Sequence, residues 1–177
     1  MPDERIRLFC ALQLPAETVE GLAAWQAAHL RGGRIVPADN LHVTLAFLGP
    51  RPATEVPAIV GELREAAAGT DCIELRPERY RETRSVGMIV FDDVGGRATA
   101  LAEDLHGRLD RLGVYRRETR RWLPHLTVIR FRQRPGLSPP GENIRSINVV
   151  RAALYASVLR PSGAQYDVLE TAALGGR

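Results

Sequence analysis

Hydrophobic positions along the chain alternate between continuous strand-like runs and helix-like spacing. The first apolar run, residues 5–14, predicts a buried strand. Residues 15–30 then carry apolar side chains at helical intervals, with a proline in the first turn and two glycines after the last, so we expect an amphipathic helix. The same reasoning predicts helices over 53–68 and 97–112, the second with Gly113 as its C-cap.

Further strands are expected between and after these helices. They cover residues 41–48, 72–75, 86–91, 123–131, 147–159 and 165–169. Gly49-Pro50 is expected to end the strand over 41–48, and an Arg-rich link is expected over 76–84. Elements in this order do not form a regular parallel βαβ array. They predict an α+β fold with a largely antiparallel sheet.

A strand, a long helix and a His-x-Thr segment occur in the same order in both halves of the chain. The first set ends at His42 and the second at His125. We therefore expect residues 1–177 to form a single domain with two similar lobes, each of which presents one motif.

The segments His42-Val43-Thr44 and His125-Leu126-Thr127 carry the candidate chemistry. Residues i and i+2 of a strand point to the same side, so each histidine has a threonine hydroxyl beside it. Opening a cyclic phosphodiester requires a base that activates water and an acid that protonates the departing ribose oxygen. Imidazole suits both roles near neutral pH. The two threonine hydroxyls can donate hydrogen bonds to the non-bridging phosphate oxygens, so the pair of motifs predicts a phosphodiesterase site.

At these residues the sequence resembles the two-histidine phosphoesterase superfamily, and within it the RNA 2′,3′-cyclic phosphodiesterases, also called 2′-5′ RNA ligases. The similar segments are residues 7–11 with Pro15, residues 40–49, residues 124–130, and residues 154–157 with Pro161, Gly163 and Tyr166. Ile129 stands where the family often has a small residue. The resemblance implies a bilobal fold in which two antiparallel sheets face a central cleft, with the helices on the outside.

The resemblance also implies hydrolysis of a terminal 2′,3′-cyclic phosphate to a 2′-phosphomonoester, without a metal or other cofactor. It makes His42 the general acid for the leaving O3′ and His125 the general base that activates water. Thr44 and Thr127 would hold the phosphate, and Arg130 would be a further phosphate contact. Strict alternation places Arg130 on the face opposite His125, so this contact requires a bulge or a strand end.

The partner implied by the resemblance is RNA that ends in a 2′,3′-cyclic phosphate, for instance a tRNA fragment, and we expect a monomer. The family also joins RNA ends through 2′-5′ bonds, and the sequence leaves open whether that weak reverse reaction persists. It contains no Walker-type loop, which argues against ATP-driven ligation. Two other functions stay open. One is a phosphodiesterase for 2′-5′ oligonucleotides or small cyclic nucleotides, and the other is an RNA-binding module without catalysis.

Composition limits the choice of compartment and partner. No apolar run approaches the roughly 20 residues of a membrane helix. The polar N-terminus is unlike a signal peptide, so we expect a cytoplasmic protein without membrane contact. The net charge of +3, carried on the basic side by arginine alone, permits a polyanionic partner because guanidinium groups bind phosphate well.

A basic cluster precedes the second motif, and it consists of Arg116, Arg117, Arg120 and Arg121. It is either a rim that guides RNA or a solvated loop, and the sequence does not decide between them. We expect the neighbouring Trp122, and also Phe9, to pack in the core.

The remaining candidate ligands are given structural interpretations. Cys10 and Cys72 are expected to be small buried residues, since neither has a second ligand at zinc-binding spacing. His29 and His106 lie in predicted helices and are expected at the surface. Asp92-Asp93 is expected to end a strand rather than to bind a metal.

Overall fold

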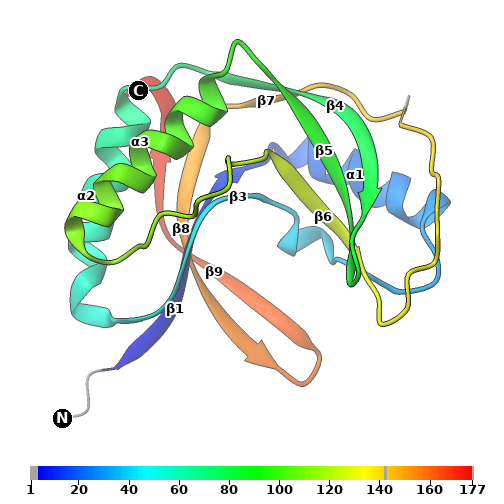
Figure 1. Ribbon diagram of the computed structural model, residues 1–177, viewed down its shortest axis with the longest axis horizontal. Coiled ribbons are helices and arrows are strands. Elements are labelled where there is room, and N and C mark those ends of the chain that lie inside the picture. Colours follow the sequence, from blue (N-terminus) through cyan, green and yellow to red (C-terminus); the bar gives the residue numbers. More distant parts are fainter. Residues whose placement is uncertain (1–3, 142, 177) are drawn as a thin grey trace.

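A computed structural model describes residues 4–141 and 143–176 (Figure 1). The described helices are α1 (Ala16–His29), α2 (Val56–Ala68) and α3 (Arg97–Leu112), with short 3-10 turns η1 (Ala38–Asn40), η2 (Ala53–Glu55) and η3 (Leu174–Gly176). The described strands are β1 (Arg5–Gln13), β2 (Arg34–Ile35), β3 (Val43–Pro52), β4 (Ile73–Glu82), β5 (Val86–Val94), β6 (His125–Arg130), β7 (Ile147–Val149), β8 (Arg151–Arg160) and β9 (Gly163–Ala173).

These strands form two antiparallel sheets, which confirms the predicted α+β class. The first sheet has the order β3-β1-β8-β9 and the second has the order β2-β6-β5-β4-β7. The first His-x-Thr motif lies at the start of β3, at an edge of the first sheet. The second lies on β6, in the second sheet. Each sheet therefore supplies one motif.

The helices cover the outer sides of the sheets. Helices α2 and α3 pack side by side, and α2 also contacts β8 and β9 of the first sheet (Figure 1). Helix α1 covers the second sheet instead. There the Gln26 amide donates hydrogen bonds to the carbonyls of Val36 (3.0 Å) and Val128 (2.9 Å). The helix after β1 thus packs on the other sheet, and the proposed internal repeat stays a prediction.

Two predicted strand ends are wrong. Strand β3 continues through Gly49 to Pro52. Among the described strands it pairs with β1 alone, at the edge of the sheet, so the missing N–H of Pro50 costs no essential ladder hydrogen bond. The expected Arg-rich link over 76–84 is mostly strand, since β4 pairs with β5 as far as Glu82. The arginines of β4 are exposed to solvent, so a search for apolar runs misses this strand.

The predicted strand over 147–159 is in fact two strands. Strand β7 pairs with β4 in the second sheet, whereas β8 pairs with β1 in the first. Val150, between them, is 52% exposed. The chain therefore crosses from one sheet to the other at a residue that the apolar pattern marked as buried.

The two cysteines differ in their surroundings. Cys10 is fully buried, as predicted, and burial raises the pKa of its thiol to about 12. Cys72 is exposed, so the prediction of burial is wrong for this residue. Strand β4 begins at Ile73, which leaves Cys72 in the irregular segment before it.

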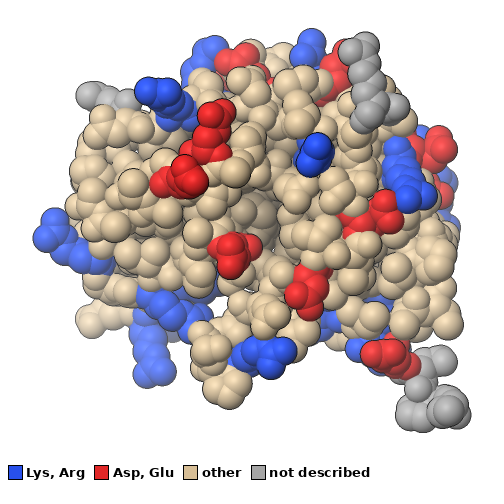
Figure 2. Space-filling view, turned by 180° about the vertical axis from the view of Figure 1, so that it is seen from behind, with Lys and Arg blue, Asp and Glu red and all other residues tan. Residues whose placement is uncertain are grey.

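Basic and acidic side chains lie interspersed on the face seen in Figure 2. No helix among the described residues is long and apolar enough to cross a bilayer.

Candidate active site

All five predicted site residues line one pocket of about 650 Å³ between the two sheets. His42 and Thr44 come from the first sheet, and His125, Thr127 and Arg130 come from β6 of the second. The two motifs are more than 80 positions apart in the sequence, and the fold brings them to one cavity.

The ring of His42 is held at both nitrogens. Its Nδ1 lies 2.7 Å from the backbone carbonyl of Asn40, and its Nε2 lies 3.0 Å from the hydroxyl of Thr44. A carbonyl oxygen only accepts, so Nδ1 carries a hydrogen. In the neutral ring Nε2 is then unprotonated and accepts the hydrogen of Thr44.

His125 is held in the same way by its own chain. Its Nδ1 lies 2.8 Å from the carbonyl of Leu123, again two residues upstream. The carbonyl of the intervening Pro124 accepts a 3.0 Å hydrogen bond from the amide of Phe91, which fixes this segment to β5. Both rings therefore carry a hydrogen on Nδ1, which leaves Nε2 as the nitrogen available for proton transfer.

Aromatic side chains surround His42. The ring centroids of Phe9, Tyr166 and Tyr155 lie 4.8, 5.4 and 6.3 Å from that of His42. Burial lowers the pKa of His42 to about 4; the charges of Arg130 and His125 act in the same direction, while the Asn40 carbonyl opposes them. His42 is therefore neutral at pH 7 when the pocket is empty.

A bulge in β6 brings Arg130 to the pocket. Gly87 of β5 pairs with Ile129 and Met88 pairs with Thr127, so Val128 has no partner across the ladder. The extra residue reverses the alternation after Thr127, and Arg130 lines the pocket with His125. This is the irregularity that the resemblance required.

The sequence and the fold both have close relatives among known proteins. Residues 12–80 match the family model for LigT like phosphoesterase. The chain is 33% identical to the RNA 2′,3′-cyclic phosphodiesterase of Escherichia coli, over 95% of this chain and 96% of that protein. It is 30% identical to the protein of the same name from Thermus thermophilus, over 97% of this chain and 91% of that protein.

The chain belongs to the LigT-like phosphoesterase family. The crystal structure of E. coli LigT in apo form superposes with a TM-score of 0.83 at 31% identity, covering 97% of this chain and 98% of that one. E. coli LigT complexed with 3′-AMP superposes with a TM-score of 0.82.

Phe47 is a pocket residue of this LigT-like chain, although strict strand alternation would place it on the face opposite His42 and Thr44. Strand β3 has two bulges against β1, because Leu45 and Leu48 both lack a partner in the register. Phe47 consequently turns away from the core, is 53% exposed and lines the pocket. The guanidinium carbon of Arg7 lies 5.4 Å from the centre of its ring.

Two side chains from the second half of the chain bond to consecutive carbonyls of β3. The indole N–H of Trp122 donates to Thr44 (3.0 Å), and Nε2 of His106 lies 2.6 Å from the carbonyl of Leu45. Trp122 packs against the core as predicted. The prediction that His106 is a surface residue is wrong, since it is half-buried and its ring centroid lies 4.9 Å from that of Tyr115.

Other predicted features lie outside the pocket. Phe9 is buried as predicted, at 3% exposure, and it also lines the pocket. The arginine cluster 116–121 is exposed and none of its members lines the pocket, so its function stays open. The carboxylate of Asp93 accepts hydrogen bonds from the amides of Ala98 and Thr99 at the start of α3. Within the described residues, no group of three or more His, Cys, Asp or Glu is placed to hold a metal ion.

Proposed function

We propose that this protein hydrolyses the terminal 2′,3′-cyclic phosphate of RNA to a 2′-phosphomonoester by metal-independent acid-base catalysis. The observation that carries the proposal is the location of His42 and His125 in one pocket, each with Nδ1 bonded to a carbonyl two residues upstream. Relatives at 30% and 33% identity that are named RNA 2′,3′-cyclic phosphodiesterase support the substrate class.

The phosphate binds between the two motifs. The hydroxyls of Thr44 and Thr127 donate to its non-bridging oxygens, and the guanidinium of Arg130 adds a positive charge. In this position the phosphorus lies between the two imidazoles, which in-line displacement requires.

The proton transfers follow from the two imidazoles. His125 accepts a proton from water through Nε2 as the water oxygen attacks phosphorus. The P–O3′ bond breaks on the other side, and His42 gives the proton on its Nε2 to O3′. One water is consumed, the ribose regains its 3′-hydroxyl and the phosphate stays on O2′. If the 5′-hydroxyl of a second RNA attacked phosphorus in place of water, the same proton transfers would open the cyclic phosphate to a 2′-5′ bond, and we expect this ligation to be weak.

His42 has to gain a proton before it can act as the acid, because its pKa is about 4 in the empty pocket. The negative charge of a bound phosphodiester opposes the effects of Arg130 and His125 and so raises that pKa. In this mechanism substrate binding and protonation of His42 occur together.

The test uses an RNA oligonucleotide that ends in a 2′,3′-cyclic phosphate, with EDTA present. The wild type should open it to the 2′-phosphate, and His42→Ala or His125→Ala should each reduce kcat by at least about 100-fold. His29→Ala, on α1 and outside the pocket lining, is the matched control and should retain full activity. Full turnover in either pocket variant, or a strict requirement for added metal, would contradict the mechanism.

A substrate panel separates the remaining alternatives. Cyclic mononucleotides, tRNA fragments with cyclic ends and 2′-5′-linked oligonucleotides should be compared by kcat/KM. We expect RNA cyclic ends to be preferred, with tRNA fragments among the accepted substrates and the protein monomeric during catalysis. A clear preference for 2′-5′ linkages would change the substrate class while leaving the two-histidine chemistry in place.

A further inference from the structure

The pocket is strongly cationic beyond the two motifs. Four arginines line it, which are Arg7, Arg34, Arg130 and Arg160, and its described lining includes no Asp or Glu. None of the four forms an ion pair with a carboxylate of residues 4–141 or 143–176. Elsewhere on the protein arginines pair with acidic neighbours, as Arg51 does with Glu55 at 2.7 Å. One phosphate does not require this many unpaired cations.

Arg7 differs from the other three arginines in having a buried side-chain nitrogen. Its Nε is shielded from solvent and has no hydrogen-bond partner in the described part of the chain. No side-chain hydrogen bond ties the Arg7 guanidinium to residues 4–141 or 143–176, so its outer N–H groups can donate to a phosphate in the pocket. The guanidinium lies beside the exposed ring of Phe47, on the pocket side of the sheet.

The distance from the reacting phosphate suits a neighbouring group on the same substrate. Arg7 and Phe9 are two residues apart on β1 and both line the pocket, so they are separated by about 7 Å along the strand. The Phe9 ring contacts that of His42, where the terminal phosphate would bind. Arg7 therefore lies further along the first sheet than Phe9, at about the distance of a neighbouring group from the terminal phosphate.

The proposed chemistry determines which sheet the RNA follows. If His42 protonates O3′, the ribose lies on the side of His42, which belongs to the first sheet. The phosphodiester that joins this ribose to the preceding nucleotide then also lies over the first sheet. Arg34 and Arg130 belong to the second sheet, and Arg160 lies at the end of β8, where its Nε bonds to Gln165. Arg7 and Arg160 are therefore the pocket arginines of the first sheet. Arg160 lies in the last residue pair of β8 and β9, beside their turn, whereas Arg7 is on β1, two residues from the Phe9 ring that contacts His42.

We propose that Arg7 binds the phosphodiester between the terminal and the preceding nucleotide, so that the enzyme prefers an RNA end to a cyclic mononucleotide. This inference rests on the proposed function. It identifies the outer part of the pocket as a subsite for a second, non-reacting phosphate.

The experiment compares adenosine 2′,3′-cyclic phosphate with a dinucleotide that ends in the same group. The wild type should show the higher kcat/KM on the dinucleotide. Arg7→Met should lower the ratio of the two kcat/KM values by about 10- to 100-fold, mainly through KM, because a charge-assisted hydrogen bond is lost. The salt dependence of the dinucleotide reaction should weaken by about 0.7 in log-log slope.

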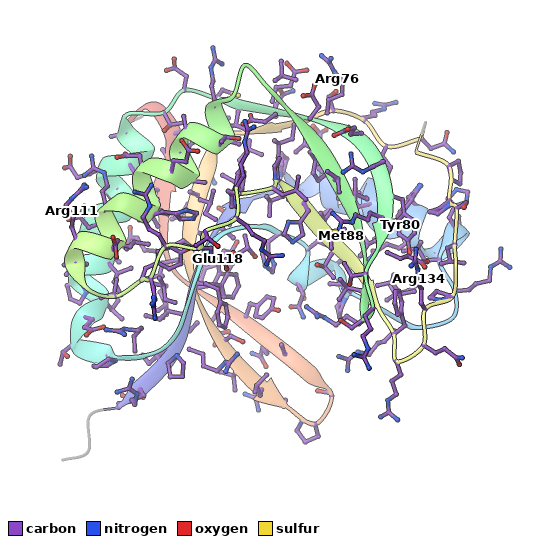
Figure 3. The ribbon with its side chains drawn as sticks, viewed as in Figure 1. Arg76, Tyr80, Met88, Arg111, Glu118 and Arg134 are labelled. Atoms are coloured by element: carbon purple, nitrogen blue, oxygen red, sulfur yellow. The ribbon has the colours of Figure 1, made fainter. Side chains whose placement is uncertain are left out.

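Two controls make the result decisive. Arg111→Met removes the same charge from the outer side of α3, outside the pocket, and should leave the ratio unchanged (Figure 3). Arg34→Met tests whether the second phosphate binds over the second sheet instead. An equal loss on both substrates in Arg7→Met, or a loss of ratio in Arg34→Met instead, overturns the proposal. If the wild type opens neither substrate, the proposed function itself fails, which is a different outcome. Circular dichroism and the more conservative Arg7→Gln exclude a folding defect.

Discussion

The indole N–H of Trp122 donates a 3.0 Å hydrogen bond to the backbone carbonyl of Thr44, and so connects the two motifs directly. Thr44 bonds to His42, and the residue after Trp122 supplies the carbonyl that orients His125. These hydrogen bonds, together with the short backbone segment from Trp122 to His125, therefore fix the position of one imidazole relative to the other. The bond is made at the outer edge of β3, where none of the described strands binds the carbonyls.

We expect Trp122→Phe to reduce kcat about 10-fold, because the ring still packs but the motifs are no longer held at a fixed separation. Loss of one hydrogen bond should lower the free energy of unfolding by about 1 kcal/mol. Steady-state kinetics and urea unfolding measure the two effects.

Trp25→Phe is the matched control, since the Trp25 indole donates a comparable 2.8 Å bond to the carbonyl of Pro140, away from the pocket. This variant should lose similar stability but keep its kcat. Equal kcat in both variants would show that the Trp122 bond only supports the fold.

The pKa of His42 should respond to an anion in the pocket. In the free protein we expect it near 4, and sulfate, a dianion throughout this pH range, should raise it. By linkage, sulfate affinity should increase as pH falls from 7 through the raised pKa and level off below the free value. NMR titration of the imidazole signals, assigned with His42→Gln, measures both effects.

The signal of His29, which lies outside the pocket on α1, should not respond to sulfate. If the pKa of His42 stays near 4 with sulfate bound, His42 cannot supply the proton for O3′ at neutral pH. The roles of the two histidines would then be exchanged.

Gly87 should tolerate no side chain. A Cβ there would contact the hydroxyl of Tyr80 and lie 2.6 Å from Cγ2 of Ile129, next to Arg130. Tyr80 cannot easily retreat, because its hydroxyl donates a 3.0 Å hydrogen bond to Glu82, which is also paired with Arg134 (Figure 3). We expect Gly87→Ala to lower the free energy of unfolding by about 1–3 kcal/mol, with reduced kcat/KM as the bulge shifts.

Gly61→Ala, on α2, is the comparison because an added Cβ there would meet no described side chain and no backbone beyond its own helix within 4 Å. It should stabilise the protein by about 0.5–1 kcal/mol, since alanine favours a helix interior over glycine. Urea unfolding of the two variants gives both values, and an unchanged stability in Gly87→Ala would contradict the packing argument.

The sequence predicts the three helices and most strand positions well, because their apolar spacing matches the core that they form. Predictions from the sequence fail where the place of a residue in the tertiary structure determines whether it belongs to a strand. Pro50 continues a strand because β3 is at an edge, and Val150 separates β7 from β8 because the two strands join different sheets.

The residues of the site also fall into those that the sequence predicts and those that it misses. The two His-x-Thr pairs can be predicted because they are local patterns on strands. Arg130 and Phe47 depend on bulges that shift the side-chain alternation, and no residue type in the sequence marks these bulges. The roles of Trp122 and His106 depend on carbonyls about 60 to 80 positions away, which no local pattern reveals.

The order of strands in the first sheet has a consequence for synthesis of the protein. Strands β8 and β9 complete that sheet, and they supply Tyr155 and Tyr166, which enclose His42. A nascent chain that already contains both motifs therefore lacks half of this sheet until the ribosome has passed Ala173. Translation must pass β8 and β9 before Tyr155 and Tyr166 join Phe9 around His42, so a shorter ribosome-bound fragment should have little capacity to attack RNA nearby.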